Sequence, residues 1–352
     1  MYFSSLNTTW FALIGLLWAG YMFLDGFDFG VCIVAPFVAR DDIERRLCLN
    51  AIGPVWDGNE VWLLTAGGAT FAAFPLWYAR LFSGFYIALF LVLLALIARA
   101  VSFEFRAKHS SQAWQDFWGW ANFAGSLIPA IVWGAAFVDL VHGVPLTSGG
   151  VYKGGLIGLL HPVALVGGLS SLALFSLHGA AFLSLKTAGE LSSRARQAAV
   201  YIGVAATALL VATVAWVAVA GRPDVPGAVS AGLPLVLAVV AIVAVAAATV
   251  LLAYRREGWA FAATGAAILM AMGAIFARMF PDVLPASNRA AYSITIQGSA
   301  SQHNTLVVMT VVAAIFTPFV LLYQGWTYWV FRQRLSRPGT GEVPPRAAAG
   351  SG

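Results

Sequence analysis

Charged residues are scarce in this chain of 352 residues, since Asp, Glu, Lys and Arg together make up only 10% of it. Hydrophobic residues account for 60%, and the mean hydropathy is +0.82. A soluble globular protein has about 25% charged residues, which keep its surface solvated. The composition therefore excludes an ordinary soluble protein and indicates an integral membrane protein.

Cysteines and the motifs of soluble enzymes are also few or absent. The two cysteines, Cys32 and Cys48, are expected near the cytoplasmic side, where thiols stay reduced, so no disulfide framework is predicted. Gly-x-Ser-x-Gly, Cys-x-x-Cys and His-Glu-x-x-His do not occur. The opening "MYFSSLNTTW" lacks the basic region of a cleavable signal peptide, so the first hydrophobic run is expected to stay in the mature protein.

Long hydrophobic runs are what the chain does have. A membrane-spanning helix needs about 20 mostly apolar residues, and a backbone in lipid must satisfy its own hydrogen bonds, which favours helices here. We predict an all-α integral membrane protein in which residues 1–334 form one polytopic domain and 335–352, rich in Pro, Gly and Ala, form a disordered cytoplasmic tail. The nine predicted helices cover approximately residues 10–39, 53–74, 77–101, 113–141, 159–185, 198–220, 233–254, 259–280 and 305–331.

The distribution of Lys and Arg predicts the orientation, because short cytoplasmic loops carry an excess of these residues. Assigning each one to its nearest loop puts fifteen of the twenty on one side, among them Arg99. The N-terminus is therefore predicted to lie outside and the C-terminus in the cytoplasm. Because the cations are scattered over several loops, they suit topology and anionic lipid headgroups, and no nucleic-acid partner is expected.

Four acidic residues lie within the first two apolar runs, where an ionised side chain at the helix centre costs about 2.5–3.5 kcal/mol. Asp25 and Asp28 are three residues apart and share one face of the first helix; Asp57 and Glu60 repeat this spacing in the second. All four are predicted in the cytoplasmic half, either as a proton entry path or as structural residues that cap helices or pair with arginines. The arginines of the first cytoplasmic loop are Arg40, Arg45 and Arg46.

Several stretches of the sequence resemble subunit II of the cytochrome bd-type quinol oxidases. In chain order they are "LDGFDFG", "ERRLCLNAIGPVWDGNEVWLLTAGGATFAAFP", "SGFYIALFLVLLALIARAVSFEFR", "GELSSRAR", "MFPDVLP" and "LLYQGWTYWVF". The resemblance runs from about residue 20 to 331 and is densest over residues 22–108. It implies a fold of two four-helix bundles plus one peripheral helix.

The resemblance also implies a function for the complex. Such a complex lies in the bacterial cytoplasmic membrane, oxidises quinol from the quinone pool, and reduces dioxygen to water without pumping protons. Two b-type haems and one d-type haem are expected in the partner, subunit I, with room for small accessory subunits and membrane lipids. This chain alone is expected to support subunit I and not to be catalytic.

The same resemblance implies functions for individual residues. Asp57, the acid of "WDGN", matches a family residue on a path that carries protons from the cytoplasm toward the d-type haem, and Trp56 and Asn59 belong to the same motif. At Glu60 the family has glutamine, so Glu60 is expected to line the path without being an obligatory relay. The acids that match the family by position alone are Asp25 and Asp28.

Haem iron needs axial His, Met or Cys ligands, and few stand inside the predicted helices. Of the five histidines, only His178 lies well within one, and packing is its expected role, so no haem or metal is expected to be held by this chain. The alternative function is a proton-coupled secondary transporter, which would repeat its broken, acid-bearing helices in two halves. No counterpart of "DGFD" or "WDGNE" follows residue 160. A purely structural scaffold is the third interpretation.

Overall fold

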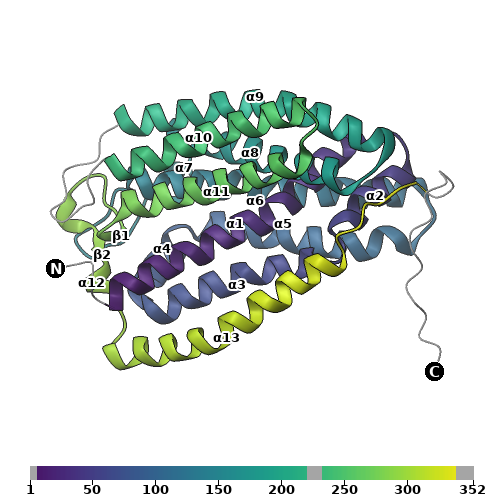
Figure 1. The fold of residues 1–352 in the computed structure, drawn as a ribbon. Coiled ribbons are helices and arrows are strands. Elements are labelled where there is room, and N and C mark those ends of the chain that lie inside the picture. Colours follow the sequence, from purple (N-terminus) through teal and green to yellow (C-terminus); the bar gives the residue numbers. More distant parts are fainter. Residues whose placement is uncertain (1–5, 220–231, 338–352) are drawn as a thin grey trace, which may run out of the picture.

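The computed structural model describes residues 6–219 and 232–337, and nearly all the long helices run along one common direction (Figure 1). Eight helices in these residues are long and apolar enough to cross a membrane. They are α1 (Leu6–Val38), α5 (Tyr86–Phe105), α6 (Gln112–His142), α8 (Pro162–Lys186), α9 (Gly189–Val219), α10 (Gly232–Ala253), α11 (Glu257–Met279) and α13 (His303–Val330). The chain is thus an all-α multi-pass membrane protein, as predicted.

The helix α3 (Trp56–Ala73) corresponds to the second predicted span and packs beside α1. It has 18 residues and carries two acids near its start, and it is not among the eight. The predicted count of nine spans and the predicted orientation therefore stay predictions. The start of α1 and the end of α13 do lie at opposite ends of the molecule (Figure 1).

The structure divides one predicted helix and starts another three residues later than predicted. The run 77–101 is divided into α4 (Pro75–Gly84) and α5, because Phe85 adopts a non-helical φ of −96° and ψ of 17°. In the run 159–185, α7 (Gly155–Leu159) ends before His161, and α8 begins with Pro162 at its first position. A proline restricts the preceding residue to extended conformations, so a new helix starts there.

The predicted helices do not include the polar helical segments, because the hydropathy pattern detects only apolar runs. The helix α2 (Asp42–Ile52) occupies the predicted first loop, and the Asp41 carboxylate caps its first turn by accepting a hydrogen bond from the Glu44 amide at 2.9 Å. The helix α9 begins at Gly189, nine residues before the predicted start at residue 198. Its polar first turns extend the helix beyond the apolar run.

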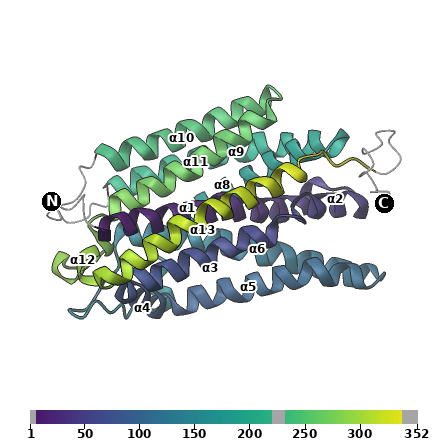
Figure 2. The same cartoon turned by 60° about the horizontal axis from the view of Figure 1, so that its bottom comes forward.

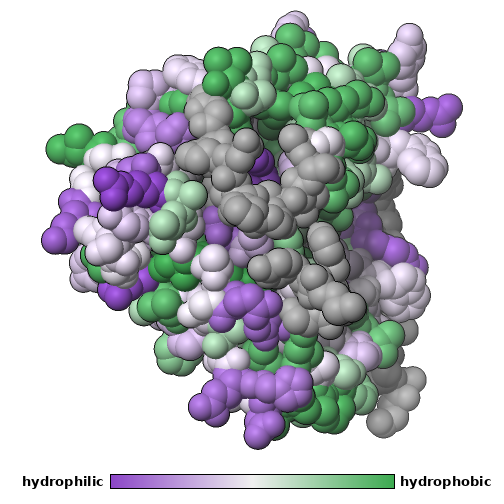
Figure 3. Space-filling model, turned by 90° about the vertical axis from the view of Figure 1, so that its left-hand side faces the viewer, coloured by the Kyte–Doolittle hydropathy of each residue, from purple (hydrophilic) through white to green (hydrophobic). Residues whose placement is uncertain are grey.

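At the end of the molecule where α1 begins, several short elements fold against each other. The strand β1 (Asp282–Leu284) pairs antiparallel with β2 (Ile294–Thr295), and α12 (Ile296–Ser299) follows. The 3₁₀ turn η1 (Arg106–Lys108) lies at the opposite end, where Arg106 pairs with Asp42 of α2, and η2 (Ala290–Tyr292) lies at this end, between the two strands in the chain. Figure 3 views this end of the molecule, where hydrophilic residues lie among hydrophobic ones.

The first helix, α1, is the centre of the fold, because it contacts α3, α6, α8, α11 and α13. It approaches α8 most closely where Gly30 faces Gly179, so that a Cβ atom on either glycine would meet the other helix's backbone. The helix α13 crosses the outside of α1 and α3 (Figure 2), and Leu306 is its one fully buried residue. Side chains of α1 are therefore shielded, whereas α13 is peripheral.

The predicted disordered tail, 335–352, falls outside the described residues except for 335–337. Leu335 exchanges backbone hydrogen bonds with Lys186 and Ala188, at 2.8 and 3.0 Å. Arg337 forms an ion pair with Asp41 at 2.8 Å. The chain therefore stays attached to the body of the protein at least as far as Arg337.

Candidate functional site

A buried ion pair joins α1 to α5. One guanidinium nitrogen of Arg99 lies 2.8 Å from Oδ1 of Asp25, and both side chains are completely inaccessible to solvent. The guanidinium also lies over the ring of Phe29, 4.7 Å from its centroid. Since removing two charges from water costs several kcal/mol each, such a pair persists only where the contacts are close, as they are here.

Two more carboxyl groups belong to this region, and one of them also contacts Arg99. Glu60 on α3 lies 3.7 Å from the same Arg99 nitrogen and is 23% exposed. Asp28, one helical turn beyond Asp25 on α1, is completely buried. One guanidinium can balance one carboxylate, so the cluster of Asp25, Asp28 and Glu60 carries acidic groups in excess of the positive charge. A buried group of this kind can hold and exchange protons.

The amide of Asn59 connects Asp28 to the peripheral helix α13. Its nitrogen donates to Oδ2 of Asp28 at 2.8 Å, and its oxygen accepts from Gln324 Nε2 at 2.9 Å and from the Tyr328 hydroxyl at 2.8 Å. Asn59 is completely buried. Hydrogen bonds thus run without interruption from α13 through α3 to α1.

The other two residues of the motif lie outside this network. Asp57 is exposed in the first turn of α3, and Trp56 is half-buried with its ring stacked on Phe103, the centroids 4.7 Å apart. Successive helical residues are rotated by about 100°, so Asp57 and Asn59 point to nearly opposite sides. The structure therefore brings Asp25, Asp28, Asn59 and Glu60 together and leaves Asp57 on the surface of this chain.

Arg99 is not a loop residue, although the sequence predicts it among the loop cations of the cytoplasmic side. It is a fully buried residue of α5. The proposed pairing of the acids with first-loop arginines is wrong, because those arginines have other partners. Arg40 pairs with Glu190 at 3.4 Å, Arg45 with Asp116 at 3.1 Å and Arg46 with Asp42 at 2.7 Å.

Hydrogen bonds and ion pairs at the α2 end lower the pKa of two surface acids. The hydrogen bond from the Glu44 amide holds the pKa of Asp41 below its usual value, and Arg337 acts in the same direction. Burial opposes ionisation of Asp42, but hydrogen bonding and attraction from Arg106 and Arg46 outweigh it, so its pKa is also lowered. These acids stabilise the fold in their ionised form.

His178 has a partner for each ring nitrogen. Nδ1 lies 2.7 Å from the Thr264 hydroxyl oxygen, Nε2 lies 3.2 Å from the Phe23 carbonyl oxygen, and the ring stacks on Phe261 with the centroids 4.5 Å apart. Within residues 6–219 and 232–337, no group of three or more His, Cys, Asp or Glu residues could hold a metal ion. Both His178 ring nitrogens are thus engaged within the chain.

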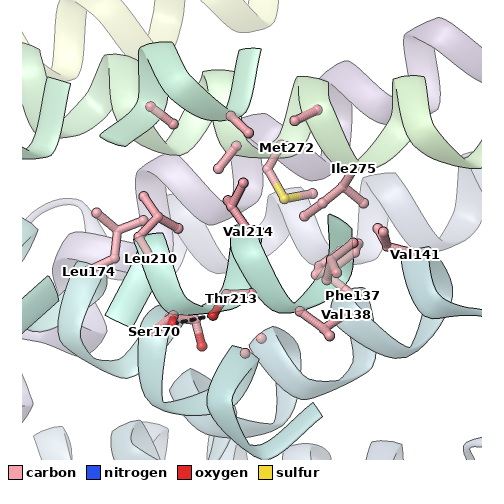
Figure 4. A pocket seen from close by; sticks show the side chains of 18 of the residues that line it. Phe137, Val138, Val141, Ser170, Leu174, Leu210, Thr213, Val214, Met272 and Ile275 are labelled. Atoms are coloured by element: carbon pink, nitrogen blue, oxygen red, sulfur yellow. Dashed lines mark hydrogen bonds between the residues drawn. The ribbon is translucent and has the colours of Figure 1, made fainter. Parts of the chain in front are cut away.

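A separate cavity of about 340 Å³ lies among α6, α8, α9, α10 and α11 (Figure 4). Its lining is mostly apolar, and the hydrogen bond of 2.7 Å between the Ser170 and Thr213 hydroxyls is drawn in the figure. Met22 is the only α1 residue in the lining, and α3, α5 and α13 contribute none. The cavity is thus distinct from the acid cluster and has few groups that carry protons.

Sequence reasoning missed three residues of the site, namely Arg99, Gln324 and Tyr328. A signal did exist for Arg99, since it stands inside the apolar run "ALFLVLLALIARAVSF" and not beyond its end. For Gln324 and Tyr328 the signal was their spacing of four residues, which puts an amide and a hydroxyl on one face of an apolar helix.

Comparisons with known proteins give the context for this geometry. The chain matches the family described as cytochrome bd terminal oxidase subunit II over residues 6–331. It is 39% identical to the cytochrome bd ubiquinol oxidase subunit 2 of Bacillus subtilis (strain 168), with 95% of this chain and 98% of that protein covered. It is 36% identical to the cytochrome bd-I ubiquinol oxidase subunit 2 of Escherichia coli (strain K12), with 94% and 96% covered.

A solved structure has a similar fold. A chain of the bd oxidase from Geobacillus thermodenitrificans superimposes with a TM-score of 0.73 and 17% sequence identity, covering 92% of this chain and 97% of that chain. At this identity the likeness concerns the fold alone.

Proposed function

The chain belongs to the cytochrome bd terminal oxidase subunit II family, and from this premise we propose that it supports a haem-bearing subunit I and lines a proton path from the cytoplasm. The chain is a multi-pass membrane subunit of an oxidoreductase complex. In our proposal the complex lies in the bacterial cytoplasmic membrane, oxidises quinol and reduces dioxygen to water without pumping protons. Family membership favours this function over a secondary transporter.

The observation that carries the proton path is the acid cluster, in which Asp25 and Glu60 lie next to one buried guanidinium and the buried Asp28 stands one helical turn from Asp25. We propose Asp57 as the entry, because it is exposed at the start of α3, and Glu60 as the next group. The two are three residues apart on one helix, a rise of about 4.5 Å. From Glu60, protons reach the surroundings of Asp25 and Asp28, with Trp56 and Asn59 lining the route.

Haem chemistry is assigned to the partner. In the proposed complex the two b-type haems and the d-type haem of subunit I supply electron transfer and dioxygen reduction. Both ring nitrogens of His178 are already engaged by Thr264 and Phe23, so we assign no haem ligand to this chain. Its residues contribute proton transfer and support.

The docking face for subunit I is expected on helices other than α1, because α1 is the most buried of the eight spans. Large apolar side chains are instead exposed on α3, α5 and α13, including Leu64, Leu93 and Phe316. We propose that subunit I covers these three helices, which would place it beside Asp57.

Replacing Asp57 tests the proton path. Asp57→Asn keeps the size and hydrogen-bonding capacity of the side chain but removes its titratable proton. The oxidase should assemble with normal haem content and lose most of its oxygen uptake per haem d. Asp28→Asn should do less harm, and Glu60→Gln least, since the family has an amide there.

The matched control is Asp116→Asn, which changes a carboxylate that pairs with Arg45 outside the cluster. It should leave turnover unchanged. Normal turnover in Asp57→Asn would remove Asp57 from the mechanism, and a parallel loss of haem and activity would indicate a structural role.

A further inference from the structure

We propose that Gln324 and Tyr328 of α13 are positioning residues for the acid cluster, a role that rests on the proton path proposed above. Both side chains donate to one atom, Oδ1 of Asn59, at 2.9 Å and 2.8 Å. They are four residues apart and half-buried, whereas the neighbouring residues 321–323 and 325–326 are exposed. On a helix that otherwise faces outward, an amide and a hydroxyl turned inward need polar partners, and Asn59 is that partner.

The two donors decide which way the Asn59 amide faces. An amide side chain has an acceptor oxygen and a donor nitrogen, and their placement follows from the surrounding partners. With the oxygen turned toward α13, the nitrogen faces α1 and donates to Oδ2 of Asp28 at 2.8 Å and to the Leu24 carbonyl oxygen at 3.4 Å. The Leu24 carbonyl can only accept a hydrogen bond, so its contact agrees with the orientation in which Gln324 and Tyr328 donate to the Asn59 oxygen.

This orientation matters for Asp28 because the Asn59 nitrogen holds one of its two oxygens. The guanidinium of Arg99 is already paired with Asp25, and Asp28 Oδ1 has no hydrogen-bond partner within the described residues. If α13 released the amide, Asn59 could rotate and present its oxygen to Asp28. That would replace a donor by an acceptor at a buried carboxyl group, which changes the proton affinity of the group.

The alternative is that Gln324 and Tyr328 only attach α13 to the body of the protein. In that case their loss would weaken docking of α13 without changing the environment of Asp28 in molecules that do assemble. The two roles therefore differ in what they predict for the assembled oxidase.

The experiment uses the assembled oxidase with Tyr328→Phe, Gln324→Leu and the double variant. Tyr323→Phe, in an exposed residue of the same helix, is the matched control. Oxygen uptake per haem d is measured across pH, and infrared spectra record the carboxyl stretching band that Asp28→Asn abolishes. Each single variant should shift this band and lower turnover about threefold, as expected for one hydrogen bond. The double variant should lower turnover more than tenfold and displace the pH profile.

The outcomes separate the two proposals. An unchanged band and pH profile in the assembled double variant would overturn the positioning role, as would a loss of haem content alone. A shifted band in the variants, with normal turnover in both Asp57→Asn and Asp28→Asn, would support the positioning role and refute the proton path. Equal shifts in Tyr323→Phe would also overturn the positioning role, because that hydroxyl does not reach Asn59.

Discussion

Within residues 6–219 and 232–337, Arg99 is the cation that contacts the acid cluster, and its charge is compensated mainly by Asp25. Removing one partner of a buried ion pair leaves an uncompensated charge, which costs about 3–5 kcal/mol, whereas replacing both partners by apolar residues can be nearly neutral. The ion pair of Arg99 and Asp25 therefore predicts how much a substitution of one or both residues changes stability.

Arg99→Leu should destabilise the assembled oxidase by about 3–5 kcal/mol, and the double variant Arg99→Leu/Asp25→Leu should recover much of that loss. The measurement is the denaturation midpoint of the purified complex. Arg40→Leu is the control, because the Arg40–Glu190 pair is exposed on both sides and such pairs contribute about 0–1 kcal/mol. Equal destabilisation by the single and double variants would contradict the prediction.

Asp41 gives a prediction about pH. Its pKa is lower in the folded protein than in an unfolded chain, so its contribution to stability is complete above the unfolded value of about 3.9. That contribution is lost as the pH falls through the lowered folded value. Hydrogen exchange at the Glu44 amide, corrected for the intrinsic rate, should therefore accelerate several-fold as the solution is acidified below about pH 4.

Asp41→Asn is the matched variant, because asparagine caps a helix about as well as aspartate but does not titrate in this range. Its protection at Glu44 should stay flat over the same pH interval. Acid-dependent exchange of equal size in both proteins would show that another group is responsible.

At the scale of helices, the approach of α1 to α8 controls where the acids lie. Gly30 and Gly179 allow the two backbones to touch, and Asp28 stands only two residues from Gly30. Gly179→Ala should force the helices apart, destabilise the complex by about 1–3 kcal/mol through overpacking, and lower oxygen uptake per haem.

Gly258→Ala is the control for this change, since a Cβ atom there meets nothing within 4 Å. Gly258 is in the first turn of α11, where alanine should be neutral or slightly stabilising. Unchanged stability and activity in Gly179→Ala would show that α1 and α8 can separate without disturbing the cluster.

At the scale of the whole molecule, the exposed apolar sides differ in what we expect to cover them. Leu64 on α3 is 75% exposed and lies on the face assigned to subunit I, whereas Val243 on α10 is 60% exposed and belongs to a helix outside that face. Leu64→Cys should be protected from a membrane-soluble maleimide in the assembled oxidase, and Val243→Cys should be labelled readily. Equal labelling at the two positions would exclude α3 from the subunit interface.

The sequence by itself determined the membrane class, the approximate place of the long helices and the motif that carries the acids. Apolar runs specify helices because lipid offers no partner to the backbone, and that rule needs no knowledge of neighbouring segments. It does not detect α2, which contains several charged residues, or the break at Phe85, which no hydropathy value marks.

Only the tertiary structure decided which acids meet. Asp57 and Asn59 are two residues apart, but the helical rotation of about 100° per residue sends them to nearly opposite sides, and packing against α1 and α13 selects Asn59 for the interior. An arginine near the end of an apolar run fits either a loop or a buried ion pair, so the sequence does not decide the place of Arg99. Its buried position is decided by Asp25, which is 74 residues away in sequence and 2.8 Å away in space.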